Sequence, residues 1–162
     1  MKLKTANGLG KYKDCDAKCD VVNYILRKDK TSEEYSGVSQ NVDEFNVVDS
    51  MNEVSEKFGK TKGVQLRHMI MSFSQEELSD VDSVNEIGKK VMNKIGEEYQ
   101  TVYAVHTDKP HLHIHLVFNS VSHIDGHRYY GTKKEFGKFK TTVKKIVREH
   151  GINSVEYVSN KK

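Results

Sequence analysis

The sequence predicts an α+β domain in which a single antiparallel β-sheet has helices packed on one face. Two apolar runs with a period of two follow each other closely, at residues 101–106 and 111–120. Only a turn-prone Thr-Asp-Lys-Pro segment separates them, so they should pair as antiparallel neighbours. Helix-like and strand-like segments intermix along the chain, and 162 residues suffice for one domain with a real core.

Each element has its own signal. Apolar side chains recur every fourth position at Ala17, Val21 and Ile25, which is typical of a helix, and Asp14 or Asp16 is available to cap it. Gly59 and Gly151 mark two later helix ends. The predicted helices cover residues 14 to about 28, 45–58, about 84–95 and 132–150. The predicted strands cover residues 64–73, 101–106 and 111–120, with an edge strand at 155–158.

Composition excludes some functional classes and leaves others open. Lys and Arg total 26 against 23 for Asp and Glu, and a net charge of +3 is too small to indicate nucleic-acid binding by itself. No run approaches the ~20 apolar residues that cross a bilayer. We therefore expect no membrane segment and a cytoplasmic protein.

Four of the eight histidines lie in one ten-residue stretch, residues 106–115, which overlaps the strand predicted at 111–120. Because side chains alternate along a strand, His111, His113, His115 and Asn119 should share one face, while the leucines and Phe118 face the core. Alternate strand residues are ~6.6 Å apart, so two imidazoles can lean onto one metal ion. The other interpretation, exposed polar residues on a solvated face, explains one or two histidines better than four.

A third ligand would come from the neighbouring strand, which ends at His106. His111 and His115 are too far apart for all three strand histidines to bind one ion. A tight hairpin would set His106 opposite His111, and a longer loop would set it opposite His113. An open metal site of this kind can activate water or polarise a phosphate.

Three sequence blocks resemble those of the MobP-type conjugative and mobilisation relaxases, within the HUH single-strand DNA endonucleases. The blocks are VNYILRKDKT at residues 22–31, RHMIMSF at 67–73 and the histidine block at 106–119. The resemblance covers most of the chain and implies one nuclease domain over residues 1–162, with the two-layer, RRM-like HUH fold. It also implies nicking and rejoining of one DNA strand at a transfer origin, in conjugation of a plasmid or an integrative element.

The resemblance implies roles for particular residues. Tyr24 is the nucleophile, which keeps the 5′ end as a phosphotyrosine, and Ser72 contacts the DNA. The metal ligands are His106, His113 and His115, with Mn²⁺ or Mg²⁺ as the ion. His111, Asp108 and Asn119 are candidates for supporting or alternative ligands.

A phenol of pKa ~10 needs help to react at neutral pH. His106 or His111 is the candidate base, and the field of the metal alone is the alternative.

Further DNA contacts are expected from the HRYY segment, through Arg128, Tyr129 and Tyr130, and from the basic face of the last helix, through Lys144 and Lys145. The implied partners are single-stranded origin DNA and accessory DNA-processing and coupling proteins, and the domain is expected to be a monomer. Two alternatives stay open: a rolling-circle replication initiator or transposase of the same superfamily, and a non-catalytic metal- or DNA-binding module in which Tyr24 is only packed.

Overall fold

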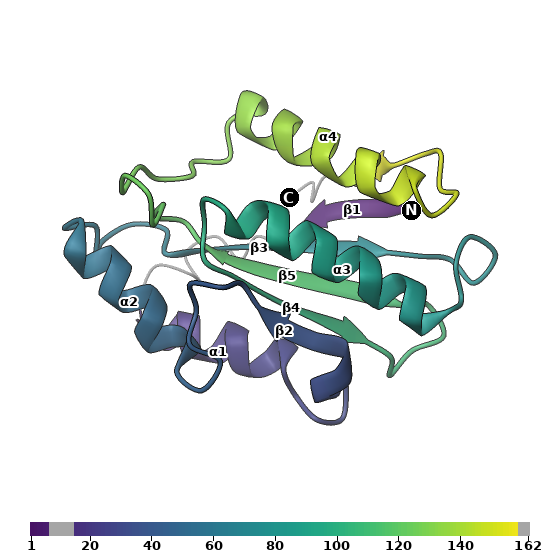
Figure 1. Ribbon diagram of the computed structural model, residues 1–162, viewed down its shortest axis with the longest axis horizontal. Helices are drawn as coiled ribbons and strands as arrows, with labels where there is room; N and C mark the ends of the chain where they lie inside the picture. Colours follow the sequence, from purple (N-terminus) through teal and green to yellow (C-terminus); the bar gives the residue numbers. More distant parts are fainter. Residues whose placement is uncertain (7–14, 159–162) are drawn as a thin grey trace.

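A computed structural model describes residues 1–6 and 15–158 and shows one six-stranded sheet in the order β2-β4-β5-β3-β1-β6 (Figure 1). The strands are β1 (Lys2–Thr5), β2 (Ser36–Val38), β3 (Leu66–Ser72), β4 (Thr101–His106), β5 (His113–Asn119) and β6 (Glu156–Tyr157). The expected antiparallel pairing of β4 with β5 and the edge strand near residue 156 are confirmed. The sheet is mixed rather than wholly antiparallel, because β6 pairs parallel to β1.

The four predicted helices are present; three are somewhat shorter than expected, and the third begins earlier than its apolar pattern indicated. They are α1 (Cys15–Ile25), α2 (Val47–Lys57), α3 (Val81–Gly96) and α4 (Lys133–Arg148), and a short 3-10 helix covers Glu33–Tyr35. A capping box between Thr132 and Glu135 begins α4. Beyond α2 and α4, Gly59 and Gly151 have φ angles of 67° and 81°, which only glycine adopts readily, so both helices end where predicted. Asp14, one expected cap, lies outside the described residues.

The larger core lies between the sheet and the helices α3 and α4. Leu116 and Phe118 of β5 contribute to it from the sheet, and Ile87 and Val143 contribute from the two helices; all four are buried. Burial of apolar side chains on this scale is the main force that holds the domain together. This is the helix-covered face that the sequence predicts.

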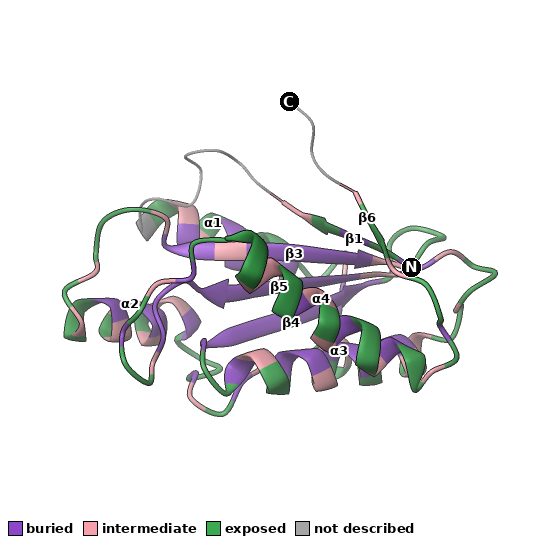
Figure 2. Ribbon diagram, turned by 90° about the horizontal axis from the view of Figure 1, so that it is seen from above, coloured by how far each residue is buried: buried purple, intermediate pink, exposed green. Residues whose placement is uncertain are grey.

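The opposite face of the sheet carries helices as well, which differs from the one-sided, two-layer arrangement expected. Val21 and Ile25 of α1 and Met51 of α2 pack against Val102 and Val117 of the sheet to form a second core. Figure 2 shows the sheet between α1 on one side and α3 on the other. The physical reason is that β4 and β5 are apolar on both faces over much of their length, so both faces must be covered.

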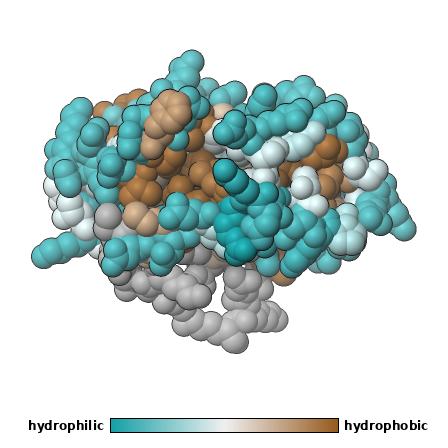
Figure 3. Space-filling view, turned by 90° about the horizontal axis from the view of Figure 1, so that it is seen from below, coloured by the Kyte–Doolittle hydropathy of each residue, from teal (hydrophilic) through white to brown (hydrophobic). Residues whose placement is uncertain are grey.

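Coverage is incomplete where this second face meets the β2 edge of the sheet. Seen from below, the side on which β2 lies in Figure 1, apolar surface shows in hollows between polar residues (Figure 3). One groove of about 470 Å³ runs beside β2 and is lined by Leu26, Val38, Val47 and the 85% exposed Phe45, among others. The histidine ends of β4 and β5 lie on the same face, next to α1. Within the described parts of the chain, no helix is both long and apolar enough to span a membrane.

Candidate active site

The strand register brings the predicted histidines together on the α1 side of the sheet. His106 of β4 pairs with His113 of β5, and Ser72 of β3 pairs with His113 from the other side. The register therefore corresponds to the longer of the two loops considered. His111 precedes β5 and is exposed in the connection from β4.

Tyr24 lies in the last turn of α1 and faces these histidines. Its ring centroid is 5.8 Å from that of His106 and 6.0 Å from that of His115, and 42% of the residue is exposed. The second core holds α1 in this position, because Val21 and Ile25, which flank Tyr24 on the helix, are buried in it. A cavity of about 180 Å³ opens here, lined by Lys4, Tyr24, Lys30, Ile70, His106, Asp108, Lys109, His113 and His115.

His106 is tied to the helix that carries the tyrosine. Its Nε2 donates a hydrogen bond of 2.9 Å to the backbone carbonyl of Ile25. This leaves Nδ1 as the only nitrogen of His106 with a free lone pair. Burial lowers the pKa of His106, so the imidazole is neutral at physiological pH.

His115 has a partner that sequence reasoning missed. The Nε2 of His68, on β3, lies 2.9 Å from the Nδ1 of His115, and both residues are buried. Desolvation lowers the pKa of His115 and brings that of His68 to about 4, so both rings are neutral. His68 lies within the RHMIMSF block, and nothing in its local sequence indicates a contact with His115.

The imidazole nitrogens of His106, His113 and His115 are of the type that binds a divalent metal. Their rings are not arranged around a common point. His113 is also kept neutral, because burial lowers its pKa, and neutral imidazole is a common metal ligand. His106 and His115 each use one nitrogen in a fixed hydrogen bond, as metal-binding histidines usually do. The rings of these two residues, however, stack with centroids 3.9 Å apart. In the described part of the chain, no three His, Cys, Asp or Glu side chains form a group able to hold an ion.

Asp108 forms an ion pair with Lys30, and no hydrogen bond to a histidine is seen for its side chain among the described contacts. Its Oδ2 accepts a hydrogen bond of 3.0 Å from the Nζ of Lys30, and the side chains are 23% and 16% exposed. This contact lowers the pKa of Asp108 and raises that of Lys30. The Lys30 ammonium lies 5.4 Å from the centroid of the Tyr24 ring. Lys30 is not among the site residues expected from the sequence.

Ser72 lies beside the histidines, as its pairing with His113 requires. It lines a neighbouring cavity of about 490 Å³ together with Lys2, His111 and His113.

Asn119 lies at the far end of β5 and does not approach the other candidate ligands. It is completely buried, and its side-chain amide donates to the carbonyl of Met51 at 3.1 Å and to Gln100 Oε1 at 3.0 Å. Its Oδ1 accepts from the backbone amide of Val121. Four residues along a strand separate it from His115, about 13 Å, and its polar atoms are used in joining α2 to the sheet.

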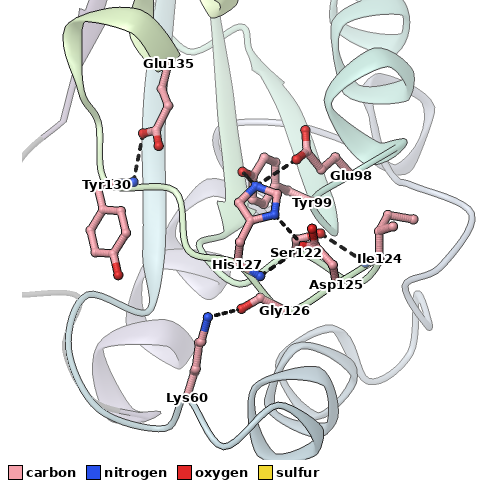
Figure 4. Close-up of polar contacts among 10 residues, drawn as sticks. All are labelled: Lys60, Glu98, Tyr99, Ser122, Ile124, Asp125, Gly126, His127, Tyr130 and Glu135. Atoms are coloured by element: carbon pink, nitrogen blue, oxygen red, sulfur yellow. Dashed lines mark hydrogen bonds and ion pairs between the residues drawn. The ribbon is translucent and has the colours of Figure 1, made fainter.

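The HRYY segment lies at that same far end, where Figure 4 shows a polar cluster. The imidazole of His127 contacts Glu98 at 2.8 Å and the hydroxyl of Tyr99 at 2.7 Å, and it also contacts Asp125. The backbone amide of Tyr130 donates to Glu135, and the residue is 67% exposed.

The other two residues of the segment have structural contacts. Tyr129 is buried against Phe118 with ring centroids 5.2 Å apart, and burial raises the pKa of Tyr129 to about 12. Arg128 donates to the carbonyl of Lys60. Tyr129 therefore packs in the core, and Arg128 and Tyr130 are not close to Tyr24.

Lys144 and Lys145 are exposed on α4, as a solvent-facing basic surface requires. The apolar face of α4 packs on the Leu116 and Phe118 side of the sheet. The two lysines are therefore separated from Tyr24 and the histidines by the sheet itself.

Comparisons with known proteins identify the family of this chain. The family model for the MobA/VirD2-like relaxase nuclease domain matches residues 24–152. A Staphylococcus aureus protein named Protein rlx is 33% identical over 135 residues, which cover 83% of this chain and 41% of that protein. The group II intron-interrupted relaxase LtrB of Lactococcus lactis subsp. cremoris is 33% identical over 75 residues, covering 46% of this chain and 13% of the relative.

Among solved structures, one from work on vancomycin resistance transfer in Staphylococcus aureus aligns over 79% of this chain and 75% of that chain. Its TM-score is 0.42 and its identity 15%. The chain spans 41% of the length of Protein rlx and 13% of the length of LtrB, so it matches less than half of either relative. The family model begins at Tyr24 and includes every histidine of the cavity. The chain belongs to the MobA/VirD2-like relaxase family, as its nuclease domain.

Proposed function

We propose that this chain is a metal-dependent nuclease domain that nicks one DNA strand at a transfer origin and can rejoin it. The observation that carries the proposal is the position of Tyr24, whose ring lies against His106 and His115 on an open part of the sheet. Tyrosine and histidines come from distant parts of the sequence. A packed helix tyrosine has no need of such neighbours or of 42% exposure.

In the proposed reaction, the hydroxyl oxygen of Tyr24 attacks the phosphorus of the scissile phosphodiester. A bond forms between that oxygen and phosphorus, and the bond from phosphorus to the 3′-oxygen breaks. The phenolic proton is released, and the departing 3′-oxygen takes up a proton. The 5′ end stays on the protein as a phosphotyrosine, and the reverse reaction with a 3′-hydroxyl rejoins the strand.

His113, His115 and the Nδ1 of His106 would hold the metal, supported by the hydrogen bonds to His68 and Ile25. When bound, Mn²⁺ or Mg²⁺ would neutralise charge on the phosphate oxygens. Because Nε2 of His106 donates to the carbonyl of Ile25, only Nδ1 remains to bind a metal or to accept a proton. His106 therefore cannot be both a metal ligand and the general base. We assign that nitrogen to the metal, and the phenolic proton then leaves to solvent through the open cavity.

The proposal extends to the setting of the reaction. We assign residues 1–162 to one nuclease domain that acts as a monomer in the cytoplasm, on origin DNA of a plasmid or integrative element. Accessory DNA-processing and coupling proteins are its proposed partners. The supporting facts are the family and a relative, 33% identical over 75 residues, that is named as a relaxase.

Covalent trapping tests the proposal without knowledge of the origin. The protein is incubated with Mn²⁺ and single-stranded oligonucleotides that carry a randomised region, and adducts are isolated on a denaturing gel and sequenced. We expect one preferred DNA sequence, with the adduct mapped to Tyr24 by peptide analysis. Tyr24→Phe should form no adduct but keep its affinity for that DNA, because only the hydroxyl is removed.

Three outcomes would count against the proposal. An adduct on another tyrosine would move the nucleophile. Binding without any adduct would favour the non-catalytic DNA-binding module. A selected DNA sequence that matches a replication origin or a transposon end would favour the initiator or the transposase.

A further inference from the structure

We propose that Lys30, oriented by Asp108, binds a non-bridging oxygen of the phosphate that Tyr24 attacks. This inference rests on the proposed function and adds to it a cationic residue that acts directly on the substrate. The first observation is position. The Lys30 ammonium lies beside the Tyr24 ring, 5.4 Å from its centroid, and lines the same cavity as the histidines.

The second observation is that two independent contacts fix Lys30. Its side chain bonds to Asp108 at 3.0 Å, and its backbone carbonyl accepts from the amide of Thr107 at 2.8 Å. Both contacts join the segment after α1 to the residues that directly follow His106. The ammonium is thereby held at the cavity instead of extending into solvent, as most lysines do.

The third observation is the charge balance of the cavity. Three lysines line it, Lys4, Lys30 and Lys109, and Asp108 is the one carboxylate among its described lining residues. An ammonium has three N–H donors, and Asp108 uses one of them. The remaining donors and the excess positive charge suit a phosphodiester, whose negative charge grows on the non-bridging oxygens as the tyrosine attacks.

The competing explanation is structural: Lys30 packs on the Tyr24 ring and holds the segment after α1 in place, and its charge has no role toward DNA. A cation beside an aromatic ring does stabilise packing. The two explanations differ in what the charge contacts. A packing role couples Lys30 to the tyrosine ring alone, whereas the proposed role couples it to the charge on one particular phosphate.

A double-substitution cycle between protein and DNA separates these explanations. The protein carries Tyr24→Phe to prevent cleavage, with or without Lys30→Met, and the DNA is the sequence selected by covalent trapping. The scissile phosphate is either unmodified or a methylphosphonate, which lacks the negative charge. We expect Lys30→Met to weaken binding of unmodified DNA by about tenfold. It should have little effect on binding of the methylphosphonate.

Kinetics give an independent readout in protein that retains Tyr24. Lys30→Met should slow single-turnover adduct formation by about 10²–10³-fold, the usual cost of losing one donor to a developing anion. Lys30→Arg should restore much of the rate, because it keeps the charge. The melting temperature should be close to that of the wild type.

Arg27→Met is the matched control. Arg27 lies on the same segment and forms an ion pair with Asp29 at 2.8 Å, but does not line the cavity. Its loss removes the same charge from the same region and should leave the cycle and the adduct rate nearly unchanged.

The inference is overturned if Lys30→Met weakens binding of both DNAs equally, if adduct formation keeps its wild-type rate, or if Arg27→Met has the same effect. A wild-type protein that forms no adduct would instead contradict the proposed function. If Lys30→Met lowered the melting temperature strongly, Lys30→Arg with the same two DNAs would decide, since coupling to the phosphate charge must persist in it.

Discussion

His106 and His113 face each other as directly paired residues of β4 and β5, so the register of one hairpin sets the separation of two candidate ligands. His115 follows on the same face of β5, stacked on His106. A slip of one residue in this pairing would turn the β5 histidines to the opposite face. The apolar residues that alternate with the histidines along these strands belong to the larger core. Packing of that core therefore also fixes the positions of the histidines.

The first prediction concerns the metal. His113→Ala and His115→Ala should each abolish tight Mn²⁺ binding and adduct formation, because each removes a proposed ligand. His111→Ala should have a mild effect, since His111 is exposed before β5. Titration calorimetry at fixed pH measures this. Complete loss of binding in His111→Ala, with His115→Ala unaffected, would show that the ligand set is displaced along the strand.

The second prediction concerns the partner of His115. His68→Leu should lower Mn²⁺ affinity by about 10–100-fold, because the hydrogen bond that orients the His115 ring is lost. His127→Gln is the matched control, a hydrogen-bonded histidine at the far end of β5 whose loss should leave Mn²⁺ affinity unchanged. Equal affinities in His68→Leu and the wild type would reduce His68 to a packing residue.

The third prediction concerns Asn119. Asn119→Ala should lower the free energy of unfolding by about 1–3 kcal/mol, because it leaves buried partners on Met51, Gln100 and Val121 without their hydrogen bonds. Mn²⁺ affinity should not change. Urea denaturation and calorimetry measure the two quantities separately. A variant with normal stability and weakened metal binding would return Asn119 to the ligand set.

The fourth prediction concerns the path of the DNA. The logarithm of affinity for single-stranded DNA should fall linearly with the logarithm of salt concentration, by about 0.7 per phosphate neutralised. Replacing Lys4 and Lys109 by Gln should flatten this slope by roughly twice that amount, since both line the cavity. Replacing Lys144 and Lys145 should leave the slope unchanged, because α4 is on the other side of the sheet. A flatter slope in the second variant would mean that the strand wraps around the domain.

Much of this architecture was predictable from local pattern, because the elements concerned have strong periodicity. Residues 101–106 form β4 as predicted, and the alternation after His111 identified the face that carries His113 and His115. The register of His106 was not predictable from spacing alone, because two loop lengths satisfied the same pattern. The strands β1 and β2 escaped notice because they have four and three residues, too few to show a period.

The second layer of helices, α1 and α2, could have been predicted from apolar residues on the histidine face of the sheet. Val102, Ala104 and Val117 lie on the same face as the histidines and are apolar, so that face had to be covered along part of its length. His68 and Lys30 are different, because nothing in their local sequence distinguishes them. Only the pairing of β3 with β5 brings His68 to His115, and only the connection after α1 brings Lys30 to Asp108. Such long-range contacts have no period to detect.

The hydrogen bond between His106 and the carbonyl of Ile25 has a consequence for the return reaction. It joins α1, which carries the proposed nucleophile Tyr24, to the sheet through a backbone carbonyl that the proposed reaction does not consume. The distance between tyrosine and histidines is therefore set by the folded chain before any DNA arrives. In the proposed reaction, the same backbone contact would keep the phosphotyrosine on Tyr24 at the place where it formed. An incoming 3′-end would then meet a site that needs no rebuilding before the strand is rejoined.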